Sequence, residues 1–171
     1  MRKVTLLAAG LAATAALLVP ATAANAATTA DTDVTFAIAG AGGNLSLITG
    51  GPVGTIVPGS GKATGTLPTV TVTDNRNGAP RGWVASATST DFGTIPKSAV
   101  VYQATALAGK VGPGTLESTG EQSLDTSKTV VNRTGLTWPL EMITWTPALT
   151  VNYPDGAAIG SYSGTITVSV A

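Results

Sequence analysis

The side chains best suited to contact a ligand in this sequence are two aromatic residues that stand beside prolines. Trp138 precedes Pro139, and Tyr153 precedes Pro154. An exposed indole or phenol ring can stack on the face of a sugar, because it combines a flat apolar surface with a polar edge. Trp138 and Tyr153 are therefore candidate stacking residues of a polysaccharide-binding site.

A second candidate ligand contact is the run Asp74-Asn75-Arg76-Asn77-Gly78. Asn and Asp tolerate a left-handed backbone and Gly adopts it readily, so the run predicts a tight turn. Calcium needs several oxygen ligands, whereas this run offers one carboxylate. A turn is the favoured interpretation, with Asp74 and Arg76 as its candidate ligand contacts.

The sequence lacks most of the residue types that common catalytic sites use. The sequence has no Cys and no His, which excludes thiol nucleophiles, Ser-His triads and the usual zinc ligands. A glycosidase would need two carboxyl groups, and the spacing selects no pair among Glu117, Glu121, Asp125 and Glu141. We expect no catalytic residue, no metal and no cofactor.

The N-terminus has the pattern of a secretory signal peptide. Arg2 and Lys3 precede an apolar, alanine-rich run over residues 4–19, and Ala24-Asn25-Ala26 supplies a small-x-small cleavage site. The apolar run is too short to span a membrane well. We expect residues 1–26 to be removed on export, with cleavage after Ala23 as the alternative. The predicted location is extracellular, without a transmembrane anchor.

The charge balance excludes one class of partner. Loss of Arg2 and Lys3 with the signal peptide reduces nine basic residues to seven, against nine acidic ones. Such a weakly acidic chain lacks the positive field that nucleic acids or anionic polymers need. We expect no nucleic-acid binding, and we expect any surface attachment to depend on stacking and hydrogen bonds. The sequence leaves the oligomeric state open.

The elements that must position these residues are β-strands. Apolar and Thr or Ser residues alternate over 34–38, 67–73, 83–88, 100–107, 143–153 and 162–170, which predicts strands with one buried face. We expect the last two to form an antiparallel hairpin around Pro154-Asp155-Gly156, and Trp83 to begin the return strand after the Asp74 turn. The predicted aromatic core residues are Trp83, Tyr102, Trp145 and Tyr162.

Short strands separated by Gly and Pro are typical of an antiparallel β-sandwich, Ig-like or Greek-key. We expect a flexible lead-in over residues 27–33 and a single domain over 34–171. Residues 109–132 are rich in Gly, Ser, Thr and Glu, and predict a long surface loop with one or two short strands. Residues 136–140 are interpreted as a short edge piece.

Two stretches are similar to parts of the WxL domain. One is the Asp-x-Arg turn at Asp74, followed by Gly82-Trp83 and then Asp91-Phe92. The other is the closing strand over 162–170, preceded by Tyr153-Pro154. The chain has Trp83-Val84-Ala85 where the family has Trp-x-Leu, and it lacks the second Trp of the closing strand. The resemblance implies an exported β-sandwich of Gram-positive bacteria that associates non-covalently with the cell wall.

Three functional hypotheses follow. The first is a secreted, non-catalytic protein of the cell surface or wall, with a wall polymer or a surface protein as partner. The second is a stand-alone polysaccharide-binding module that uses Trp138 and Tyr153. The third is a small glycoside hydrolase, which would need a cleft with two carboxyl groups about 5–10 Å apart.

Overall fold

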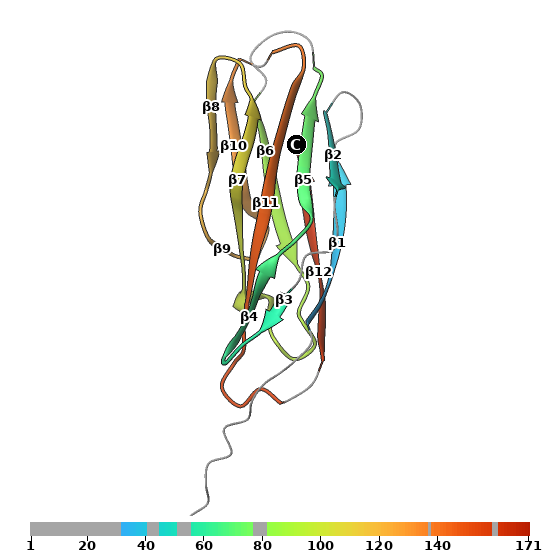
Figure 1. Ribbon diagram of the computed structural model, residues 1–171, viewed down its shortest axis with the longest axis vertical. Helices are drawn as coiled ribbons and strands as arrows, with labels where there is room; N and C mark the ends of the chain where they lie inside the picture. Colours follow the sequence, from blue (N-terminus) through green and yellow to red (C-terminus); the bar gives the residue numbers. More distant parts are fainter. Residues whose placement is uncertain (1–31, 41–44, 51–55, 77–81, 137, 159–160) are drawn as a thin grey trace, which may run out of the picture.

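The computed structural model describes residues 32–40, 45–50, 56–76, 82–136, 138–158 and 161–171. These residues form two β-sheets that pack against each other, with a single 3-10 turn at Lys97–Ala99 and no α-helix (Figure 1). The predicted all-β sandwich is therefore confirmed. The predicted signal peptide lies outside the described residues. Within them, no helix has the length and apolar character needed to cross a membrane.

The first sheet has five strands. In spatial order they are β1 (Thr32–Gly40), β12 (Tyr162–Val170), β6 (Trp83–Ser89), β10 (Lys128–Gly135) and β8 (Gly114–Ser118). Neighbours pair antiparallel except β1, which lies parallel to β12 from the Thr32–Tyr162 pair onward. The β1–β12 pair is thus a parallel exception at the edge of an otherwise antiparallel sheet, and β1 begins inside the segment expected as a lead-in.

The second sheet is organised around its longest strand, β11 (Glu141–Asn152). Strand β7 (Val100–Lys110) pairs with β11 along one side, and on the other side two short strands pair with successive parts of it. These are β5 (Thr69–Asp74) and β4 (Lys62–Thr66). The remaining strands are β2 (Leu45–Gly50) beside β5, β3 (Ile56–Pro58) beside β4, and β9 (Gln122–Ser123) beside β7.

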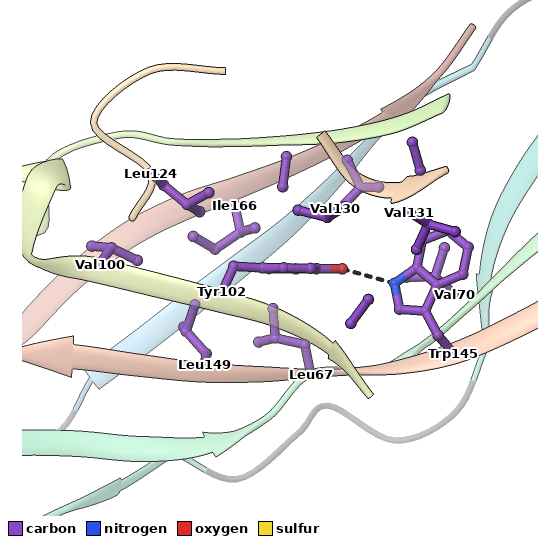
Figure 2. Close-up of a cluster of buried hydrophobic side chains, with 14 of the residues drawn as sticks. Leu67, Val70, Val100, Tyr102, Leu124, Val130, Val131, Trp145, Leu149 and Ile166 are labelled. Atoms are coloured by element: carbon purple, nitrogen blue, oxygen red, sulfur yellow. Dashed lines mark hydrogen bonds between the residues drawn. The ribbon is translucent and has the colours of Figure 1, made fainter. Parts of the chain in front are cut away.

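The core lies between the sheets and follows the period-2 pattern of the sequence. Every second residue of β11 is buried, from Ile143 through Trp145 to Val151, and the residues between them are more exposed. The indole Nε1 of Trp145 donates a hydrogen bond of 2.9 Å to the Tyr102 hydroxyl, both fully buried (Figure 2). This burial raises the pKa of Tyr102. Trp83 and Tyr162, the other predicted aromatic core residues, are also buried.

Two predicted hairpins are wrong in their pairing. Strand β5 belongs to the second sheet and β6 to the first, and the same holds for β11 and β12. Each connection therefore crosses from one sheet to the other instead of turning back beside its own strand. Sheets in a sandwich lie about 10 Å apart, a distance that a connection of eight or nine residues spans easily.

The segment expected as a long surface loop, residues 109–132, is mostly strand. It contains the end of β7, all of β8 and β9, and the first part of β10, which lies between β6 and β8. Val130 and Val131 are both buried because a bulge interrupts the β10–β6 register between Thr129 and Val131. The bulge breaks the alternation that would otherwise mark the strand.

Candidate functional site

One end of the sandwich contains a buried ion pair between neighbouring elements of the two sheets. Arg133 on β10 donates from Nε to Glu141 Oε2 at 3.0 Å and from Nη2 to Oε1 at 2.8 Å. Glu141 begins β11, and both side chains are fully shielded from solvent. A paired guanidinium and carboxylate of this geometry is rigid, because two parallel hydrogen bonds fix both position and plane.

The same two side chains hold the neighbouring loops. The backbone N–H groups of Gly112 and Trp138 donate to Glu141 Oε1 at 2.6 and 3.1 Å. Arg133 donates in return to the carbonyls of Leu136 and Thr134. The loop between β10 and β11 is thus fastened by its backbone at both Leu136 and Trp138, and the loop after β7 is fastened at Gly112.

This fastening turns an apolar segment outward. Leu136, Trp138, Leu140 and Met142 are 50, 36, 58 and 55% exposed, whereas Glu141 is buried. The usual order is reversed, because the charged side chain faces the core while its apolar neighbours face solvent. We call these four residues the exposed apolar segment. The short edge piece predicted over 136–140 is not part of a sheet in the residues described there, which lie in the loop before β11.

Gly112 permits the position of the Trp138 indole. A Cβ added at Gly112 would lie 2.7 Å from Trp138 Cδ1, 2.9 Å from the Leu136 carbonyl and 3.0 Å from the Trp138 nitrogen. Only a residue without a side chain lets the ring and its backbone approach this closely. The indole therefore rests against the β7–β8 loop on one side, and Trp138 as a whole keeps about a third of its surface exposed.

A second ion pair lies beside the first. Asp74, at the end of β5, is the cross-strand partner of Glu141. The Asp74 carboxylate accepts hydrogen bonds from Arg76 Nε at 2.8 Å and Nη2 at 2.9 Å, and Arg76 also contacts the Gly82 carbonyl. Asp74 is 1% exposed. The two residues predicted as ligand contacts thus bind each other, and the Asp74 carboxylate is shielded from solvent. The rest of the predicted turn, Asn77-Gly78, lies outside the described residues.

The pKa values of both buried carboxylates are lowered. Burial alone would raise the pKa of Glu141, but hydrogen bonds from Arg133, Gly112 and Trp138 outweigh burial. At Asp74, burial is likewise outweighed by hydrogen bonds from Arg76. A glycosidase general acid needs a raised pKa so that it holds a proton near neutral pH. These two carboxylates have the opposite property.

The other predicted acidic residues do not form a metal site or a buried pair. Glu117, Glu121 and Asp125 are exposed on β8 and on the turns flanking β9, and Asp125 contacts Lys128 at 2.9 Å. In the part of the chain that the structure describes, no group of three or more acidic residues is arranged to hold a metal ion.

Tyr153, the second predicted stacking residue, directly follows the end of β11 that is opposite to Glu141. It follows the twelve-residue strand β11, so about 40 Å of strand separates it from the Trp138 loop. Its ring lies 6.0 Å from that of Tyr162 at 32°, and its hydroxyl is buried without a hydrogen-bond partner among the described residues. Trp138 and Tyr153 therefore do not form one stacking surface.

The sequence interpretation missed the residues that position Trp138. Gly112 lies inside the segment expected as a loop, Arg133 directly follows that segment, and Glu141 is a candidate only as one of the glycosidase carboxylates. A usable signal was present: Leu136, Trp138, Leu140 and Met142 recur at every second position, out of phase with the buried residues of β11. Two apolar series in opposite phase predict that one of them faces solvent.

No protein-family model, curated protein or solved structure matches this chain. The similarity to the WxL domain therefore depends on the short sequence motifs alone.

Proposed function

We propose that this protein is a secreted, non-catalytic β-sandwich that attaches to the cell wall through the exposed apolar segment around Trp138. The observation that supports it most is the exposed indole, fixed by backbone hydrogen bonds to a fully buried ion pair. Exposed aromatic rings on a rigid support bind with little loss of conformational entropy. The signal-peptide pattern and the WxL-like motifs support export and a wall polymer as the partner.

An uncharged part of the polymer suits this surface best. The segment contributes one indole and three aliphatic or thioether side chains, while the charged groups beside it are buried and paired. Such a surface gains from covering apolar faces, such as the C–H faces of sugar rings, and gains little from phosphates. Binding should therefore resist salt, because screening acts mainly on exposed charges.

Hydrolysis is not proposed as a second function. The two buried carboxylates at this end are held by arginines, and although burial acts to raise their pKa values, hydrogen bonds leave both pKa values lowered.

Fractionation of the producing cells tests the proposal. We expect the protein in the wall fraction, and we expect it to stay there through a wash with sodium chloride at about 1 M, where the Debye length is about 3 Å. Recovery only from the medium, or complete release by salt, would contradict it. A mature N-terminus near Ala27, measured by mass spectrometry, would support the export step.

A further inference from the structure

The outer face of the first sheet has a hollow at the same end as the exposed apolar segment. Its volume is about 390 Å³, and its surface includes Val84, Asn132 and Thr134. Small-molecule sites occupy about 300–1,000 Å³, so this hollow suits a single ring. Gly135 lines it and is followed directly by Leu136, which begins the exposed apolar segment.

The hollow arises from a close approach of two backbones. A Cβ at Gly82, the residue before β6, would lie 2.4 Å from the Arg133 carbonyl, so the chain entering β6 approaches β10 this closely only because Gly82 has no side chain. Beside them, the backbone of Val84 exchanges hydrogen bonds with Ala171. Paired strands therefore form most of the described lining of the hollow, and Gly82 and Ala171 complete it at the strand ends.

The side chains form a row across the strands. Val84 on β6 pairs with Asn132 on β10, and Asn132 pairs with Glu117 on β8. Val84 is 38% exposed and gives an apolar floor, while the Asn132 amide can donate and accept. Glu117 adds exposed acceptor oxygens at the margin. An apolar floor with a few polar groups beside it is the usual composition of a sugar or small-ligand site.

The charges select against an anion. The one cationic side chain that lines the hollow, Arg133, turns its guanidinium into the core and binds Glu141. The remaining ionisable side chain in the row, Glu117, repels negative groups. We infer that the hollow is a second subsite, which takes one uncharged sugar ring of the polymer. The inference rests on the proposed function, because it assigns a further contact to the same ligand.

Titration of the ¹⁵N-labelled protein with two neutral probes, the N-acetylglucosamine tetramer and cellotetraose, tests this subsite. We expect saturable shifts of the amide signals of Val84, Asn132 and Thr134 with at least one probe. Val84→Glu and Asn132→Ala should each weaken this binding by about tenfold, as for a lost contact of that kind. Thr88→Ala, on the same face of β6, is the matched control and should leave the affinity unchanged.

The outcomes separate the two proposals. Shifts near Trp138 without shifts in the hollow would overturn the subsite and leave the proposed function standing. Shifts in the hollow alone would support the subsite and count against Trp138 as a contact. The absence of amide shifts in the hollow with both probes would overturn the subsite. Unchanged affinity of folded Val84→Glu and Asn132→Ala proteins would also overturn it.

Discussion

A buried ion pair, Arg133–Glu141, stabilises one end of the sandwich, whereas packed aromatic side chains stabilise the opposite end. At the ion-pair end, directional hydrogen bonds fix the backbone of two loops. At the aromatic end, Phe92 is fully buried beside Gly164, and Tyr153 lies against Tyr162.

The difference has a consequence for the surface. Seven large apolar side chains are exposed among the residues whose side-chain burial the structure describes, and four of them belong to the exposed apolar segment at the ion-pair end. Aromatic packing stabilises by burying its own apolar groups, so it leaves few of them outside. Buried ion pairs satisfy the backbone of a loop without burying its side chains. The ion-pair end therefore exposes more large apolar side chains than the aromatic end does.

The largest expected effect is at the ion-pair end. Glu141→Gln leaves the Arg133 charge buried without its partner, and removal of one member of such a pair costs about 3–5 kcal/mol. Urea denaturation measures the free energy of unfolding. The matched control is Asp125→Asn, which breaks the exposed pair with Lys128 and should not change stability measurably. A loss below about 1 kcal/mol for Glu141→Gln would show that the pair does not hold this end.

Acid should lower the free energy of unfolding through the two buried carboxylates at the ion-pair end. Because the folded pKa values of Asp74 and Glu141 lie below their ordinary values of 3.8 and 4.5, both groups stabilise the fold above that range. That contribution should be lost as the pH falls through the lowered pKa values. Stability measured from pH 7 downward should stay level to about pH 5 and then decline. The decline should be smaller in Glu141→Gln, and an equal decline in both proteins would argue against this origin.

At the aromatic end, crowding should have an intermediate effect. A Cβ at Gly164 would lie 2.4 Å from the Phe92 ring, so Gly164→Ala forces a packed side chain to move. Overpacking of this kind costs about 1–3 kcal/mol. Ser163→Ala, at the exposed neighbouring position, should be near neutral. If Gly164→Ala and Ser163→Ala unfold at the same temperature, Phe92 can shift to make room for the added methyl group.

The smallest expected effects on stability are those of removing the hydroxyl groups of Tyr162 and Tyr153. The Tyr162 hydroxyl donates to the Ala158 carbonyl, and its loss in Tyr162→Phe should cost about 0.5–1.5 kcal/mol. The Tyr153 hydroxyl is buried without a described partner, so Tyr153→Phe should be neutral or stabilising. Denaturation of the two variants side by side checks this. The reverse order would mean that the Tyr153 hydroxyl is bonded in solution.

The strands with clear alternation were predictable because burial of one face imposes a period of two. Their pairing was not, since local pattern does not say which sheet a strand joins, and β5–β6 and β11–β12 cross between sheets. Strand β10 was missed because adjacent buried valines at a bulge and a buried Arg133 both break the pattern.

Of the candidate site, only the exposed position of Trp138 could be predicted from the sequence. The neighbouring Pro139 placed Trp138 outside a central strand, and it is exposed. Its support was not foreseen, because Arg133 and Glu141 become partners only when β10 and β11 are assigned to facing sheets. Charged residues in a sequence are ordinarily expected at the surface, and burial of a pair depends on tertiary geometry.

The affinity for purified Gram-positive cell walls, freed of their anionic polymers, tests the central claim most directly. Trp138→Ala should weaken binding by about tenfold or more, equivalent to about 1.4 kcal/mol, without a comparable loss of folding stability. Gly112→Ala keeps the indole but crowds it, and should weaken binding too. Val57→Ala removes an exposed apolar side chain on β3 and should bind as the unchanged protein does. Wild-type affinity in Trp138→Ala would contradict the account.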